Sequence, residues 1–201
     1  MIDLIFETII KAGSVIYFIF FISLYGWYLI SKKYFFIRNE IRDSDVMIND
    51  IIDYLNTGSI NNLINYLNDK NRVITESLLG IIKTCNLKNI DLFFDEKRIH
   101  YYSILENDLG TIGTLSGIAP LLGLLGTVSG MMTTFTVIKI YGSANPALMA
   151  DGISEALLTT QAGLVVAFPL VLANTFLKNR VKEIKNNFEK IYMTMKRMEN
   201  V

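Results

Sequence analysis

One acidic side chain, Glu155, interrupts a stretch of sequence that carries no other charge from Gly152 to Leu177. An ionisable group within a membrane helix costs about 2.5–3.5 kcal/mol on insertion scales, so it marks a functional site by default. A carboxyl group there can take up a proton and release it. The hydroxyls of Thr127, Thr159 and Thr160 can both donate and accept hydrogen bonds. We therefore predict a proton pathway through these four residues, with a purely structural carboxylate as the alternative.

Small and hydroxyl side chains predict how the two helices that carry these residues pack. At spacings of three and four, the segment before Glu155 holds Ser116, Pro120, Gly123, Thr127, Gly130 and Thr134, with Gly126 beside them. The segment that contains Glu155 holds Gly152, Ala156, Thr159, Gly163, Ala167 and Asn174. Lipid offers helices no hydrophobic reason to associate, so small residues that allow close approach mark the contact. The simpler interpretation is a packing seam with no further function.

Three stretches, uncharged apart from Glu155 in the third, are long enough to cross a membrane. At about 1.5 Å per residue, about 20 residues cross a hydrocarbon core of about 30 Å. The stretches predict transmembrane helices at 12–31, 109–138 and 152–177, the second and third being long. No useful alternation of apolar and polar residues occurs, so the predicted fold class is an all-α integral membrane protein.

Basic residues predict the orientation. Lys32 and Lys33 follow the first span, and Lys178 and Arg180 follow the third. Cytoplasmic flanks are the ones enriched in Lys and Arg. We therefore expect a short periplasmic N-terminus at 1–11, a cytoplasmic helical domain at 32–108, a periplasmic loop at 139–151 and a cytoplasmic helical tail at 178–201. We expect the first span to be retained rather than cleaved, because its positive charges come after the apolar run.

The predicted cytoplasmic parts read as amphipathic helices. The tail repeats apolar residues at spacings of three and four: Val181, Ile184, Phe188, Ile191, Met195 and Met198. One such stripe indicates a helix that continues the third span and packs on the 32–108 helices or on a neighbouring subunit. The segment 89–108 could run unbroken into the second span.

Composition excludes several classes of function. The chain has 19 Lys plus Arg and 19 Asp plus Glu, so its net charge gives no sign of nucleic-acid binding. Its single cysteine, Cys85, and single histidine, His100, do not make a metal site. We expect no metal, no cofactor and no enzymatic activity.

Two longer motifs carry a resemblance to a known family. The runs APLLGLLGTVSGMMTTF and GISEALLTTQAGLVVAFPLVLAN resemble the paired membrane helices of the MotA/TolQ/ExbB proton channel family, and most closely its ExbB branch. The likeness is close over 118–174 and extends to the rest of the chain as a layout of helices. It departs in the first span, which has no acidic residue, and at Gln161, where we expect a small residue.

The resemblance implies an assembly and a mechanism. It implies a homo-pentamer in the bacterial inner membrane around a dimer of a single-span partner similar to ExbD. Such a complex uses the proton-motive force to energise a TonB-like protein that opens outer-membrane transporters, as in siderophore uptake. The essential glutamate of the family matches Glu155, and its pore threonines match Thr127 and Thr160. Ideal helix geometry instead favours Thr159, about 40° from Glu155 against about 140° for Thr160, so both stay candidates.

Other functions stay open at this point. TolQ-like envelope maintenance is the alternative within the family. In a different class, the chain could be a scaffold or a transporter helper subunit that conducts nothing. Only the proton pathway predicts that function depends on a titratable group at position 155.

Overall fold

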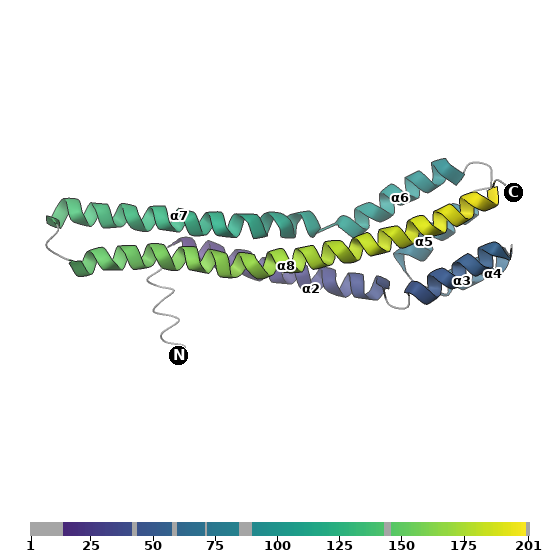
Figure 1. Cartoon of the computed structure of the whole chain (residues 1–201), viewed down its shortest axis with the longest axis horizontal. Helices are drawn as coiled ribbons and strands as arrows, with labels where there is room; N and C mark the ends of the chain where they lie inside the picture. Colours follow the sequence, from purple (N-terminus) through teal and green to yellow (C-terminus); the bar gives the residue numbers. More distant parts are fainter. Residues whose placement is uncertain are drawn as a thin grey trace. The chain divides into compact units, whose positions relative to one another are not determined.

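The computed structural model describes residues 14–41, 44–57, 60–70, 72–84, 90–142 and 146–199. Within these ranges the regular secondary structure is helical (Figure 1). The helices are α2 (Val15–Ile41), α3 (Ser44–Asn56), α4 (Ile60–Asn68), α5 (Val73–Thr84), α6 (Ile90–Glu106), α7 (Leu109–Tyr141) and α8 (Pro146–Glu199). Cys85 and the predicted N-terminal segment 1–11 lie outside the described residues.

Three stretches contain a helix long and apolar enough to cross a membrane, within Val15–Ile41, Phe94–Ile140 and Met149–Arg197, and in the second of these the apolar helix is α7. The prediction of an all-α membrane protein with three such helices is therefore confirmed. α7 continues past Ile138 to Tyr141, and α8 begins at Pro146, where a proline suits the first helical turn. The orientation of the chain and its pentameric state stay predictions.

The chain divides into two compact units. The first consists of α2 up to Ser31 together with Asp108–Thr175, and the second consists of Lys32–Asn107 together with the chain from Phe176 onward. α2 and α8 each contribute residues to both units, and α8 is one helix of 54 residues with Pro169 inside it. The predicted continuation of the third span into a helical tail is thus present as helix.

α6 does not run unbroken into α7. Asn107 and Asp108 form a turn between them, and Asp108 has φ 70°, in the left-handed region. An aspartate tolerates that conformation better than most non-glycine residues, because its short polar side chain can bond locally. The interruption separates the amphipathic α6 from the apolar α7.

An aromatic cluster forms the core of the second unit. Phe188 of α8 stacks on Phe94 of α6 and lies tilted against Tyr101 of the same helix, with ring centroids 4.9 Å apart in both pairs. The tail stripe Val181, Ile184, Phe188, Ile191 and Met195 is buried in the structure. α8 therefore packs on α6 through that stripe, and stacked rings of this kind add about 0.5–1.5 kcal/mol to the burial of their area.

Two buried charged side chains, Lys33 and Glu40, link the end of α2 to the other helices of the second unit. Lys33 Nζ donates to the carbonyl of Ile104 at 3.1 Å. Glu40 Oε1 accepts from the Ile74 amide at 2.9 Å and from the Tyr101 hydroxyl at 3.1 Å. Burial, followed by the neighbouring Glu40 charge, raises the pKa of Tyr101 above its ordinary value. The tyrosine therefore stays protonated and donates to Glu40.

Replacing Phe188 with Ala should loosen the second unit. The side chain is 0% exposed, and a buried Phe→Ala change costs about 3–5 kcal/mol. Hydrogen–deuterium exchange of the α6 amides should accelerate about a hundredfold or more, since each 1.4 kcal/mol is tenfold. Met193→Ala, on the same helix but 60% exposed, is the control and should leave α6 exchange unchanged. Equal exchange in both variants would contradict the packing described above.

Candidate functional site: the α7–α8 packing face

α7 lies along the N-terminal part of α8 in the first unit (Figure 1). The buried positions of α7 on this face recur at spacings of three and four: Ile112, Ser116, Ala119, Gly123, Gly126, Gly130 and Thr134. Those of α8 are Gly152, Ala156, Thr159, Gly163, Ala167, Leu170 and Asn174. Most of these side chains are small, so the two backbones come close together.

Glycines make that close approach possible. A Cβ atom at Gly126 would overlap the Thr159 side chain, and one at Gly130 would lie 2.9 Å from the Cβ of Ala156. At Gly163 it would lie 2.7 Å from the carbonyl oxygen of Ala119. Contacts this short exclude any larger residue without movement of the helices. The register of the two antiparallel helices is therefore set by steric contact along the whole face.

The two threonines of α8 have different surroundings. Thr159 is 1% exposed, lies against Gly126, and donates to the Ala156 carbonyl of its own helix at 2.9 Å. Thr160 is half-buried, and its hydroxyl donates across the interface to the carbonyl of Gly123 at 3.0 Å. Thr159 is thus held inside the α7–α8 contact, whereas Thr160 reaches its edge.

The buried line of α7 differs slightly from the predicted one. It passes through Ala119 and Gly126, while Pro120 and Thr127 are half-buried beside it. Thr127 donates to the Leu124 carbonyl of its own helix at 2.6 Å. The 3.6-residue period of a helix allows either line, and only the partner helix decides between them. Ala119 was not among the predicted contact residues, although it is small and lies four residues before Gly123.

Glu155 is half-buried at the other edge of the same face. Gly130 lies against Ala156 and Gly126 against Thr159, so Thr127 is level with the turn of α8 that carries Glu155. The Glu155 carboxylate has no hydrogen bond or ion pair with any residue that the structure describes. On an ideal helix it lies about 140° from Thr160. The α7–α8 pair thus presents the carboxylate and the Thr160 hydroxyl on different sides.

A second polar group lies further along the face. Asn174 is 7% exposed, and its Nδ2 lies 3.0 Å from the position that a Cβ of Gly113 would take. Its Oδ1 has no hydrogen-bond partner among the described residues. Nearby in the α7 sequence, Ser116 donates to the Gly113 carbonyl at 2.7 Å. Among the described residues, no group of three or more His, Cys, Asp or Glu side chains gathers to hold a metal.

Comparison with known proteins places this face in a family context. Residues 68–190 match the MotA/TolQ/ExbB proton channel family. An ExbB homolog of Methanothermobacter thermautotrophicus is 29% identical over 93% of this chain and 67% of its own length. The Tol-Pal system protein TolQ of Haemophilus influenzae is 37% identical over 42% of this chain and 37% of its own length. The biopolymer transport protein ExbB of Pseudomonas putida is 41% identical over 37% of this chain and 23% of its own length.

Gly126→Leu should separate α7 from α8. The added side chain meets Thr159 directly, and overpacking of a tight contact costs at least about 1–3 kcal/mol. We expect a lower thermal midpoint and loss of the native particle on size-exclusion chromatography in detergent. Gly117→Leu is the matched control, because a Cβ at Gly117 meets nothing within 4 Å. A Gly126→Leu protein as stable as the Gly117→Leu protein would show that the contact between Gly126 and Thr159 is not required for stability.

Proposed function

Since the chain belongs to the MotA/TolQ/ExbB proton channel family, and is thus a proton-channel-type subunit of an ExbB- or TolQ-like complex, we propose that it energises TonB-dependent transport. It would do so as the channel subunit of a multi-pass inner-membrane motor that uses the proton-motive force. One observation supports this most directly. Glu155 is a carboxylate without a partner among the described residues, in a helix segment that is otherwise uncharged.

The energy scale suits such a motor. One proton crossing 100 mV releases about 2.3 kcal/mol, so a few protons can drive repeated small movements. The short contacts between α7 and α8 fix the two helices relative to each other, so each subunit presents a fixed surface to the moving proton. The half-buried hydroxyls of Thr127 and Thr160 supply hydrogen-bond donors and acceptors on that surface.

The role of each residue follows from its surroundings. Thr160 and Thr127 line the path, Glu155 sets the local charge and gates it, and Thr159 holds the helices together. Because Glu155 and Thr160 face different sides of one α7–α8 pair, the path needs more than one pair around it. That requirement supports a homo-oligomer, for which the pentamer implied by the resemblance is the specific proposal.

The proposed complex includes further components. A dimer of an ExbD-like single-span protein would occupy the pore, and a TonB-like protein would receive the energy. Lys32, Lys33, Lys178 and Arg180 favour a cytoplasmic side next to the first and third spans. In this orientation the N-terminus is periplasmic and the C-terminus cytoplasmic.

A TolQ-like role in envelope maintenance is the second candidate. The likeness to the Haemophilus influenzae TolQ supports it. Both roles use the same face and the same glutamate, so they are distinguished by phenotype. Loss of siderophore uptake indicates the TonB role, whereas sensitivity to detergent indicates the TolQ role.

Glu155→Gln should abolish energised ferric-siderophore uptake while leaving the complex assembled. Glutamine keeps the size and polarity of glutamate, but its amide group cannot take up and release a proton as a carboxyl group does. Uptake is measured in cells with matched membrane levels and oligomer size. Asp151→Asn, an exposed acid one turn earlier on α8, is the control and should keep native uptake. Native uptake in the Glu155→Gln cells would make the glutamate structural and favour a non-conducting scaffold or helper subunit.

Thr160→Val should reduce uptake strongly, and Thr159→Val should not. Valine has nearly the shape of threonine but no hydroxyl, so only Thr160 loses a bond to the other helix. The Thr159 hydroxyl bonds within its own helix, and its packing against Gly126 is retained by valine. Thr160→Ser, which keeps the hydroxyl, should restore uptake. The opposite ranking of the two valine variants would assign the path to Thr159.

A further inference from the structure

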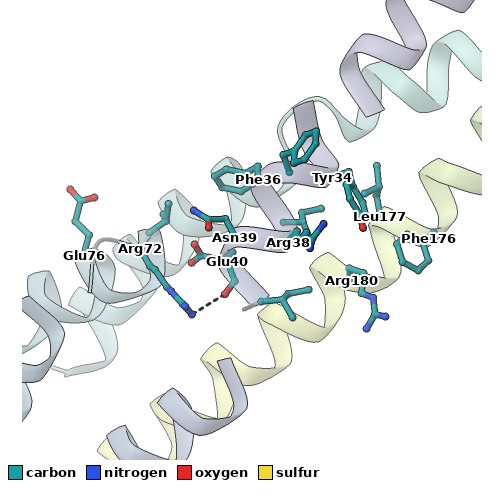
Figure 2. A pocket seen from close by; sticks show the side chains of 14 residues that line it. Tyr34, Phe36, Arg38, Asn39, Glu40, Arg72, Glu76, Phe176, Leu177 and Arg180 are labelled. Carbon is teal, nitrogen blue, oxygen red and sulfur yellow. Dashed lines mark hydrogen bonds between the residues drawn. The ribbon is translucent and has the colours of Figure 1, made fainter. Parts of the chain in front are cut away.

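A groove opens in the second unit, between the end of α2, the start of α5 and the part of α8 that begins at Phe176. Its volume is about 1120 Å³. Figure 2 shows that side chains from three separate segments of the chain meet there. The residues that matter for its chemistry are Tyr34, Phe35, Arg38, Arg72, Phe176 and Arg180. None of them belongs to the α7–α8 face.

Three guanidinium groups give the groove its charge. Arg38 forms no hydrogen bond or ion pair with any described residue. Arg180 pairs with Glu183 at 2.9 Å, but both side chains are exposed, and exposed ion pairs add little to stability. Arg72 donates to the Glu40 carbonyl at 3.4 Å. Arg38 and Arg180 are therefore available to an external anion at little cost.

The two carboxylates that also line the groove compete weakly for these arginines. Glu40 is buried, and its Oε1 is held by the Ile74 amide and the Tyr101 hydroxyl. Figure 2 shows the Glu76 carboxylate pointing away from the three guanidinium groups. Three arginines and two carboxylates are among the lining residues, and Arg38 has no carboxylate partner among the described residues.

Three aromatic side chains of the lining are exposed. Phe35 is 66% exposed, and Tyr34 and Phe176 are also exposed. These residues lie at or just past the ends of the apolar stretches 12–31 and 152–177 of the sequence. Aromatic side chains and arginines at the ends of membrane helices sit at the level of the lipid headgroups. A water-soluble anion would leave this apolar half of the groove uncovered.

We propose that the groove binds the phosphate of an anionic phospholipid, with Arg38 and Arg180 as the main ligands. Guanidinium groups match phosphate oxygens through paired hydrogen bonds. Basic pockets next to transmembrane helices on the cytoplasmic side are the usual places for such headgroups. The acyl chains cover Phe35 and Phe176. This site needs the chain to be in a membrane but does not depend on proton conduction through Glu155.

The test is to measure lipid retention by the intact complex. The oligomer is purified in lipid nanodiscs or detergent with equal amounts of dioleoyl phosphatidylglycerol and dioleoyl phosphatidylcholine, and bound lipid is counted by native mass spectrometry. We expect the native protein to retain phosphatidylglycerol in preference to phosphatidylcholine. R38Q/R180Q should reduce that retention about tenfold, as expected for the loss of charge-assisted hydrogen bonds. R38K/R180K should retain an intermediate amount, since lysine keeps the charge but not the paired geometry.

Two controls make the result specific. K182Q/K190Q removes two exposed basic residues of α8 that do not line the groove, and should retain the native amount of phosphatidylglycerol. If R38Q/R180Q fails to assemble, the single R38Q change decides the question, because Arg38 bonds to no described residue. Glycerol 3-phosphate in solution should not displace the lipid.

Several results would overturn the proposal. Equal retention of the two lipids would show that the groove does not distinguish an anionic headgroup from a zwitterionic one. Unchanged phosphatidylglycerol retention in R38Q/R180Q would place the lipid elsewhere. Displacement by glycerol 3-phosphate would make the groove a site for soluble phosphates, and no retained lipid at all would indicate that a second copy of the chain or another protein covers it.

Discussion

The backbone contact between α7 and α8 is the constraint on which the membrane part of this protein depends. In lipid, two apolar helices gain little by burying apolar area against each other, so van der Waals contact at short range has to hold them. Gly126 against Thr159 and Gly163 against Ala119 supply that contact. Because these approaches are short, they fix both the register and the rotation of the helices. The positions of Glu155, Thr127 and Thr160 follow from that geometry.

The second unit is held together by a different kind of interaction. Large side chains fill its core, where the Phe188 ring contacts both Phe94 and Tyr101. Its buried charges, Lys33 and Glu40, are satisfied by backbone groups and by a tyrosine. α8 takes part in both kinds of packing: its small residues before Thr175 contact α7, and its apolar stripe after Phe176 is buried in the second unit. One continuous helix therefore carries the candidate proton site and anchors the aromatic core.

Polar groups at the edge of a tight contact are well suited to moving charge. The centre of the α7–α8 face is closed to water by its own packing, as Thr159 shows. Its edges keep a carboxylate and hydroxyls half-exposed, where a neighbouring chain or a partner can meet them. Family membership, the apolar helices and this arrangement agree with one another. The arginine groove adds a separate surface, suited to the lipid around the complex rather than to the proton.

Much of this protein could be predicted from its sequence, because the relevant signals are local. Long apolar runs predicted the three apolar helices, the tail stripe predicted the buried face of α8, and two long motifs indicated the family. The sequence could not choose between Thr159 and Thr160, or between Gly126 and Thr127, as the centre of the contact. Adjacent residues lie about 100° apart on a helix, and a packing stripe is about that wide, so only the partner helix decides which of the two is buried. The groove was also invisible in the sequence, since Arg38, Arg72 and Arg180 come from distant segments that only the tertiary structure brings together.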